Sequence, residues 1–536
     1  ESKIPKPDDY QSKVIEIIKP IMEDSSIPKT GQNVKFDALI LMRLGVRVRG
    51  LKFDTMIAAH LLKPELRSIK LDNLSKEYLD YAMIPITDLI GTGRNQITMA
   101  EVELDKASFY AAEDADIALQ LTLIFEKKLE DEKLLSFFNE VELPLIPVLL
   151  EMEFKGMYVD EQLLNEMSSD FGKKIDSLTK GIYNESGFEF NVNSTQQLAK
   201  ILFDVKGLPE IKKRSTAEDV LEQLKGKHIL PEMVLEFRKL NKLKNTYIDA
   251  LPELINQSSG RIHSTFNQAM TATGRLSSSN PNFQNIPIKT QEGREIRKAF
   301  RSSDPNWLIF SADYSQIELR IMAHLSQDEA LVDAFNKGVD IHATTAASVF
   351  NVSIDEVEPS MRRTAKIVNF GLLYGAGPFR MSQELGIPQK EAKSLIEAYF
   401  ATYAGIKNYV DSMMDFAKEN RFVTTLLGRK RPVWDIDSSN HLHREAAKRM
   451  AINMPIQGTS AEMIKLAMTS IYESIIEKKM ESNMLLQIHD ELVFESPKDE
   501  LNELKDIVLD KMINAMSLSV PIEVDSGHGQ SWYEAH

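Results

Sequence analysis

The pattern of apolar and polar positions changes along the chain and divides it into three stretches. Up to about residue 138, short apolar runs are broken by Pro and Gly and alternate with helical stretches, which indicates an α/β unit. Residues 139–260 follow a helical period, with loop-like interruptions at Gly187–Asn193 and Gly207–Arg214. From residue 261 onward, strand and helix patterns are mixed. The pattern therefore predicts a multidomain protein that combines α/β and α+β folds.

Two apolar runs in the third stretch end in acidic residues. Leu308–Asp313 is predicted to be a buried strand followed by a helix over residues 315–324, and residues 484–495 are predicted to be two strands joined by the turn His489-Asp490-Glu491. Acids at the ends of apolar strands are costly unless a cation compensates them. A pair of divalent metal ions would do so. Taken alone, Asp313 is better explained as a helix N-cap, and the turn is equally well explained as a polar hairpin.

The segment between these runs, residues 361–375, is predicted to be a helix with an unusual face. At a spacing of four residues, this face carries two cations and then two aromatic rings, namely Arg362, Lys366, Phe370 and Tyr374. Twelve residues span about 18 Å, close to the length of an extended nucleoside triphosphate. Cations suit a polyphosphate, and flat rings suit a sugar and a base. The alternative is an amphipathic packing helix, but Gly371 and Gly375 would each destabilise it by about 1 kcal/mol relative to Ala.

Six segments, in this order, carry a resemblance to a known family. They are Thr271–Ser278, Asn282–Pro287, Ser311–Arg320, Arg362–Gly375, Ala451–Thr459 and His489–Glu491. The chain resembles the family A DNA polymerases, the family of bacterial DNA polymerase I, in their large-fragment region. The resemblance implies a right-hand arrangement of palm, thumb and fingers, preceded by a partial ribonuclease H-like exonuclease domain.

The resemblance also implies a division of the chain into five parts. These are an incomplete 3′–5′ exonuclease-like domain (1–138), the thumb (139–260), the first part of the palm (261–325), the fingers (326–440) and the second part of the palm (441–536). An antiparallel palm sheet would lie behind the acids. The chain would leave the sheet after Asp313, form the mobile fingers with the nucleotide helix, and return at Asp490.

Composition agrees with this class of protein but gives no hint of its partner. With 536 residues, 43% hydrophobic and 27% charged, the chain is long enough for several domains. It has no apolar run long enough to span a membrane and no secretory signal, and its lack of cysteine excludes disulfides and thiolate metal sites. The net charge of −15 argues against nucleic acid if it is taken globally. Locally, however, residues 206–244 carry ten Lys or Arg against six Asp or Glu.

For the reaction centre, the resemblance implies a two-metal site. Asp313 and Asp490 would bridge two Mg²⁺ ions, with Mn²⁺ as an alternative, and the backbone carbonyl of Tyr314 would be an additional ligand. Glu491 would support them as a further catalytic residue. Lys366 would neutralise the triphosphate and could also protonate the departing pyrophosphate.

For the incoming nucleotide, the resemblance implies a deoxynucleotide site. Its residues would be Arg362, Lys366, Phe370, Tyr374, Glu318 and, as a weaker assignment, His342. Phe370 would press on the sugar and Glu318 would crowd its 2′ position, so a ribose hydroxyl would clash. Some relatives carry Tyr where this chain has Phe370, which implies poor acceptance of dideoxynucleotides. Tyr374 would occupy the template-base position until the fingers close.

For the duplex, the resemblance implies contacts from the palm and the thumb. The palm residues would be Arg275, Gln284, Asn453, Gln457, Arg449 and His489, and the thumb residues would be Lys242, Lys244 and Asn245. The minor groove presents acceptors in every correct base pair, so donors there can test pair geometry without reading sequence. A charged cluster on a helix, such as the one in the thumb, is by itself more often only a solvated face.

The first stretch resembles the family's 3′–5′ exonuclease domain only in part. The matching residues, interpreted as an exonuclease remnant, are Asn33, Asp37, Tyr110 and Asp114. The Asp-x-Glu pair that should precede them is absent from residues 1–32. We therefore expect a fragment without its early strands, and no proofreading by this chain.

Taken together, the motifs predict a DNA-templated DNA polymerase acting in repair and replication gap filling. Its partners would be primer–template duplex DNA and dNTPs, without a membrane, and it would be a monomer in the bacterial cytoplasm, at the nucleoid. Two alternatives stay open. One is 3′–5′ exonuclease activity if the missing N-terminal strands exist, and the other is a non-catalytic DNA-binding protein.

Overall fold

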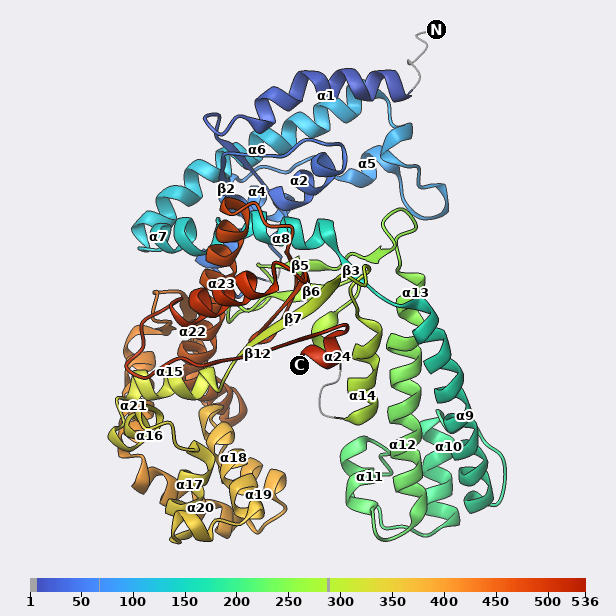
Figure 1. Cartoon of the computed structure of the whole chain (residues 1–536), viewed down its shortest axis with the longest axis vertical. Coiled ribbons are helices and arrows are strands. Elements are labelled where there is room, and N and C mark those ends of the chain that lie inside the picture. Colours follow the sequence, from blue (N-terminus) through green and yellow to red (C-terminus); the bar gives the residue numbers. More distant parts are fainter. Residues whose placement is uncertain (1–6, 67, 287–289) are drawn as a thin grey trace.

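The chain folds around a four-stranded sheet, with one block above it and two helical lobes below it (Figure 1). The computed structural model describes residues 7–66, 68–286 and 290–536; Pro287, in the second motif, lies outside them. The mixed architecture confirms the predicted fold class. No helix in the described ranges is both long and apolar enough to cross a membrane.

The block at the top of Figure 1 packs helices on a two-stranded parallel sheet. Its elements are α1 (Pro7–Glu23), β1 (Lys29–Gly31), α2 (Val34–Arg43), β2 (Leu51–Asp54), α3 (Thr55–Leu62), α4 (Leu71–Leu79), α5 (Ile86–Ile90), α6 (Leu104–Asp131) and α7 (Leu135–Phe137). Phe53, Leu121 and Phe125 are buried in its core. The buried Asp54 carboxylate accepts backbone N–H groups at the starts of both α2 and α3, which fixes these two helices to β2.

One lower lobe is a long helical hairpin with a small helical tip. Its elements are α9 (Glu161–Ser186), α10 (Thr195–Ala199), α11 (Glu218–Leu224), α12 (Ile229–Leu243) and α13 (Ala250–Glu253). Helices α9 and α12 pack side by side, and the breaks after Ser186 and Val205 fall where the sequence predicts loops. Helix α8 (Leu145–Lys155) falls inside the predicted thumb range, but it contacts α2 and the strand over residues 483–488. The five predicted domain boundaries stay predictions.

The central sheet has the order β10-β11-β7-β12 and is antiparallel throughout. Its strands are β7 (Trp307–Tyr314), β10 (Asn483–Ile488), β11 (Glu491–Pro497) and β12 (Val524–Gly529); the short pairs β3 (Met157–Tyr158) with β4 (Arg261–Ile262) and β5 (Thr265–Asn267) with β6 (Ser277–Ser279) flank it. Residues 484–495 thus form the predicted hairpin, whose turn holds His489 and Asp490. Both acid-bearing runs are strands, as their apolar patterns predict.

The second lower lobe is inserted between β7 and β10. It contains α16 (Glu329–Asn336), α17 (Ile341–Phe350), α18 (Pro359–Leu373), α19 (Pro378–Leu385), α20 (Gln389–Thr402), α21 (Ala404–Asn420) and the hairpin of β8 (Phe422–Thr424) with β9 (Lys430–Pro432). The predicted helix over residues 361–375 corresponds to α18, and Tyr374 lies at its C-terminal cap. Ala365, Val368 and Leu372 bury the opposite face of α18, which leaves the predicted nucleotide face available.

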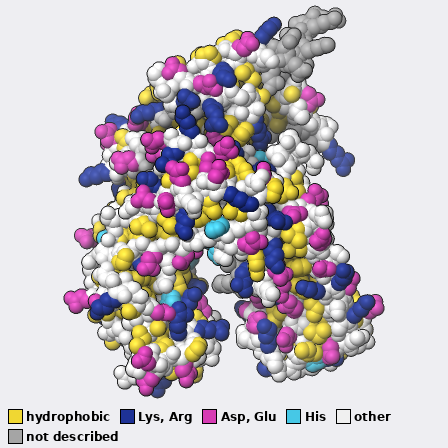
Figure 2. Space-filling view, viewed as in Figure 1, with side chains coloured by type: hydrophobic (Ala, Val, Ile, Leu, Met, Phe, Trp, Pro, Cys, Tyr) yellow, Lys and Arg dark blue, Asp and Glu magenta, His cyan; other side chains and the backbone are white. Residues whose placement is uncertain are grey.

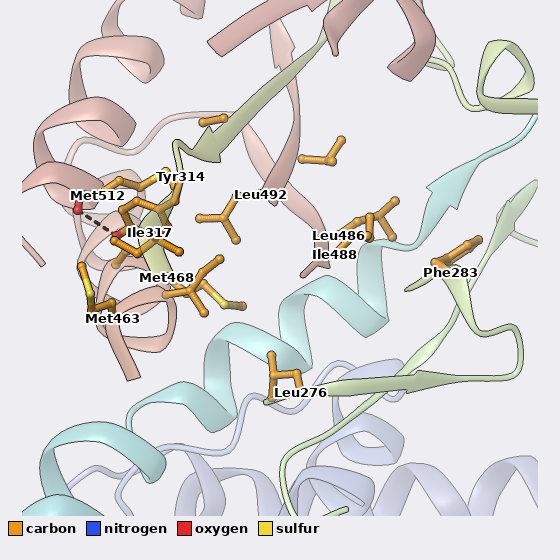
Figure 3. Packing of buried hydrophobic residues seen from close by; sticks show 14 of the residues in the cluster. Leu276, Phe283, Tyr314, Ile317, Met463, Met468, Leu486, Ile488, Leu492 and Met512 are labelled. Carbon is orange, nitrogen blue, oxygen red and sulfur yellow. Dashed lines mark hydrogen bonds between the residues drawn. The ribbon is translucent and has the colours of Figure 1, made fainter. Parts of the chain in front are cut away.

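A large apolar core anchors the sheet to the helices around it. These helices are α14 (Gln291–Ile296), α15 (Ile317–Ser326), α22 (His441–Glu477), α23 (Leu501–Ile513) and α24 (Trp532–Ala535). Met463 and Met468 of α22 pack toward Tyr314, Ile317 and Leu492 (Figure 3). The Tyr314 hydroxyl donates to the Met512 carbonyl at 2.7 Å, so the end of β7 is fixed from behind. This core holds Asp313 and its neighbours in place.

A buried polar cluster lies where the top block, the sheet and the second lobe meet. Glu142 accepts from Arg429 at 2.8 Å, from Lys465 at 2.7 Å and from Gln268 at 3.0 Å. All four side chains are almost fully buried. Because a buried charge is stable only when it is paired and hydrogen-bonded, this cluster fixes the relative positions of the elements that meet there.

Glu462, beside this cluster, gives a testable pH dependence. Burial raises the pKa of Glu462 to about 7. Because the folded-state pKa lies above the unfolded value, the corresponding stability is present below about pH 4.5 and is lost as the pH rises through about 7. We therefore expect Glu462→Gln to gain about 2 kcal/mol relative to the wild type between pH 5 and pH 8, measured by urea unfolding. The exposed Glu397→Gln is the control, and an equal shift in both variants would refute the assignment to Glu462.

Candidate active site

Acidic side chains gather at the end of β7. Asp313 lies directly opposite Glu491 of β11 and Asp525 of β12, and the Asp490 carbonyl accepts the Tyr314 backbone N–H at 3.2 Å. Burial, followed by the charges of Glu491 and Asp490, raises the pKa of Asp313 to about 7. Burial and the neighbouring carboxylates thus both disfavour the ionised form of Asp313. A bound cation would favour that form.

Glu491 faces a different set of partners from the other acids. Its carboxylate accepts from Ser311 Oγ at 2.5 Å and from Trp532 Nε1 at 2.7 Å, and it lies 3.8 Å from Arg297 and 3.4 Å from His536. Burial alone would raise its pKa, but hydrogen bonds from His536 and Ser311 lower it on balance. Glu491 is therefore an anion held inside the protein, which agrees with a supporting role.

The polar face of α18 borders a cavity of about 530 Å³. Lys366, Phe370 and Tyr374 line it together with Arg363 and Arg380. The two aromatic rings are stacked, with centroids 6.5 Å apart. Three of the four residues predicted for this face thus share one cavity.

Arg362 and His342 lie beside this cavity. Arg362 Nε donates to Asp340 at 2.7 Å, so its guanidinium is turned toward α17. The His342 ring lies 5.8 Å from that of Phe370, and its Nδ1 accepts from Asn369 at 3.0 Å. Burial, followed by the charge of Lys366, lowers the pKa of His342 to about 4, so its imidazole is neutral at pH 7. His342 therefore lies beside Phe370 as a neutral ring held by Asn369.

Glu318 of α15 connects Arg275 to the end of α18. It accepts from Arg275 Nη2 at 2.6 Å and from the Tyr374 hydroxyl at 2.6 Å, while Arg275 lies 3.8 Å from Asp490. Asn453 Nδ2 in turn donates to the Tyr374 carbonyl at 3.4 Å. Asp490, Glu318 and the aromatic end of α18 are therefore linked by direct contacts.

The remaining predicted DNA contacts are distributed over the palm and the thumb. Gln284 Nε2 donates to Gln487 Oε1 at 3.3 Å, and Gln487 donates to the His489 carbonyl. Arg449 packs against Gly375 at the end of α18. The other assigned positions are Gln457, half-buried on α22, and the exposed Lys242 and Asn245.

Lys244 is already engaged within the protein. Its Nζ donates to Asp249 at 2.7 Å and to Ser168 Oγ at 2.8 Å. Because the Asp249 carboxylate offsets the charge of Lys244, this lysine attracts a phosphate less strongly than the exposed Lys242 does. The sequence pattern could not reveal the contact with Ser168, because Ser168 lies on a different helix, α9.

The exonuclease remnant also comes together in part. Asp37, Tyr110 and Asp114 line a cavity of about 660 Å³ in the top block, while Asn33 lines a neighbouring one. Burial, followed by the charges of Glu113 and Asp37, raises the pKa of Asp114. Among the described residues, no group of three or more His, Asp or Glu side chains is placed to hold a metal ion. A metal ion at the acids near the end of β7, or at the exonuclease remnant, would therefore be bound by a pair of carboxylates together with other oxygen ligands.

Sequence patterns missed several residues of the site. They are Arg363 and Arg380 at the cavity, Ser460 on Asp490, Gln487 beside Gln284, and Arg297 behind Glu491. Arg363 carried a signal, because it precedes Lys366 by one helical turn. The others come from distant segments and had none.

Paired acids beside a cationic and aromatic cavity form the type of site that a nucleotidyl-transfer enzyme requires. Comparison with known proteins specifies the family. The model described as DNA polymerase family A matches residues 161–534, and the model described as 3′-5′ exonuclease matches residues 2–130. The chain belongs to DNA polymerase family A.

Individual relatives agree with this assignment. DNA polymerase I of Pseudomonas aeruginosa is 41% identical, over 98% of this chain and 58% of that protein. DNA polymerase I of Geobacillus stearothermophilus is 42% identical, over 96% of this chain and 59% of that protein. The chain thus spans less than two thirds of these relatives. A structure described as the POL domain of Pol1 from M. smegmatis in complex with DNA primer-template and dNTP is 37% identical, with a TM-score of 0.89, over 99% of this chain and 89% of that one. Family A polymerases use divalent metal ions.

Proposed function

We propose that this chain is a DNA-templated DNA polymerase that extends a primer 3′-hydroxyl with deoxynucleotides, in repair and replication gap filling. Its partners are primer–template duplex DNA and dNTPs, and it acts as a monomer in the cytoplasm, at the nucleoid. The observation that carries the proposal is the Glu318 bridge, which joins the acids of the palm to the aromatic end of α18. A non-catalytic DNA-binding protein would not need this arrangement.

The residues at the end of β7 fit a metal-dependent reaction. Asp313 and Asp490, with the Tyr314 carbonyl, would hold two Mg²⁺ ions, with Mn²⁺ as an alternative; the raised pKa of Asp313 supports a cation there. When bound, such ions activate the attacking hydroxyl and stabilise the leaving oxygens. Lys366 and Arg362 neutralise the β- and γ-phosphates, and Lys366 donates a proton to the departing pyrophosphate. For this role Arg362 must leave Asp340.

Sugar selection follows from two side chains at the other end of the site. Phe370, supported by His342, presses on the sugar, and the buried Glu318 fills the space at its 2′ position. Tyr374 occupies the template-base position and moves aside when the fingers close, which requires its hydrogen bond to Glu318 to break.

The duplex is held between the two lower lobes. Figure 2 shows a deep hollow between them, with Lys and Arg side chains on both sides. Arg275, Gln284, Asn453 and Gln457 test the minor groove near the primer terminus, with Arg449 and His489 beside them. Lys242 and Asn245 bind phosphates from the thumb, and Lys244 does so when it leaves Asp249.

A labelled primer annealed to a longer template tests the proposal. We expect Mg²⁺-dependent extension to the template end with dNTPs. We expect an unchanged primer when dNTPs are omitted, because residues 1–32 lack the Asp-x-Glu pair that should precede Asn33. A mixture without Mg²⁺ is the control. An absence of extension by folded protein would refute the polymerase assignment, whereas shortening of the primer without dNTPs would refute only the absence of proofreading.

A further inference from the structure

The polymerase site is connected to the top block through a buried guanidinium. Arg429, between β8 and β9, donates from Nη1 to Glu142 at 2.8 Å and from Nη2 to His60 Nδ1 at 3.1 Å. His60 belongs to α3 of the top block, and both side chains are at most 5% exposed. Burial and the charge of Arg429 lower the pKa of His60 to about 3, so its imidazole is neutral and accepts the hydrogen bond.

Arg429 also packs directly against the turn that presents Arg275. Gly274 has a φ of +83°, and a Cβ placed on it would lie 3.0 Å from both Cζ and Nε of Arg429. On the other side, a Cβ on Gly458 of α22 would lie 3.3 Å from the Thr273 carbonyl. The turn is therefore confined between the guanidinium and a helix, and small displacements of either would be transmitted to it.

Arg275 leaves this turn and enters the site. The turn is closed by Thr271 Oγ1, which donates to the Arg275 carbonyl at 2.5 Å, and the Arg275 guanidinium binds Glu318 at 2.6 Å. The path from the top block to the reaction centre thus consists of direct contacts only, from His60 through Arg429 and Gly274 to Arg275.

We propose that His60 is a positioning residue of the polymerase site, which acts by fixing Arg429 and, through it, the turn that aims Arg275. The top block then serves the polymerase reaction whether or not it has nuclease activity. This inference rests on the proposed function. The simpler explanation is that His60 only stabilises the contact between the two parts.

Another contact between the same parts separates these explanations. Arg47 of the top block pairs with Glu151 of α8, and neither residue takes part in the contacts that lead from His60 to Arg275. If His60 were only a structural contact, Arg47→Ala and His60→Ala would have similar effects on catalysis. If it is a positioning residue, only His60→Ala affects the function of Arg275.

The experiment compares kcat and KM for the next dNTP on matched and mismatched primer termini. For His60→Ala we expect kcat on matched primers to fall about tenfold with KM changed by less than about twofold, and discrimination against mismatched primers to fall as well. His60→Asn, which keeps an acceptor near Nδ1, should restore kcat to within about twofold, and Arg47→Ala should match the wild type. Arg429→Lys, which keeps the charge but loses the forked contacts, should lose at least as much as His60→Ala.

Thermal unfolding of each variant shows that it is folded before kinetics are compared. Wild-type discrimination in folded His60→Ala and Arg429→Lys, or equal losses in His60→Ala and Arg47→Ala, would overturn the positioning role. If the wild type itself fails to extend the primer, the proposed function fails instead. One series of variants therefore distinguishes a failure of the positioning role from a failure of the proposed function.

Discussion

Asp490→Ala is expected to reduce primer extension at least about 1,000-fold, since it removes one of two carboxylates that would hold the metal ions. Asp490 is partly exposed, and its side chain contacts Ser460 Oγ at 3.1 Å and Arg275 at 3.8 Å. Its removal also lowers the repulsion that raises the pKa of Asp313. We therefore expect the variant to be at least as stable as the wild type, which makes a loss of activity specific to catalysis.

Single-turnover extension and thermal unfolding together check this result. Asp525→Asn is the control, because Asp525 is another acid whose charge acts on Asp313 but lies on the outer strand and is exposed. We expect it to retain activity to within about threefold. Extension by Asp490→Ala at more than a tenth of the wild-type rate would place the metal site elsewhere.

Glu318→Ala is expected to raise incorporation of ribonucleotides relative to deoxynucleotides by about 100-fold, because it opens the space at the 2′ position of the sugar. Glu318 is 5% exposed and is the common acceptor for Arg275 and Tyr374. Without it, both donors lose their partner, so extension with dNTPs should fall about tenfold.

Competition between a dNTP and the corresponding rNTP on one primer measures this ratio directly. Glu391→Ala, which removes an exposed carboxylate on α20 of the second lower lobe, serves as the control and should leave the ratio unchanged. Unchanged discrimination in Glu318→Ala would contradict the assigned sugar contact while leaving the polymerase assignment intact.

Local patterns determined the elements that carry the site. The apolar runs at β7, β10 and β11 and the four-residue spacing in α18 are confirmed, because burial in a sheet and the helical period act over short stretches of chain. The motifs identified the family for the same reason. The domain boundaries and the roles of individual residues stay predictions.

Only the tertiary structure showed which partners these residues meet. Arg362 turns to Asp340, Lys244 pairs with Asp249, and the carboxylate of Glu491 is enclosed by Ser311 and Trp532. These contacts depend on how helices and loops pack, and residues with the same local pattern can meet different partners.

The sequence by itself determined the class of fold, the family and the positions of the acids and of the cationic and aromatic helix face. The tertiary structure decided how the parts are connected, as the contact between His60 and Arg429 illustrates. Those two residues lie far apart in the chain, and no periodicity links them. Their contact exists because packing excludes water from the junction, where a buried guanidinium must find acceptors from whichever segments meet there.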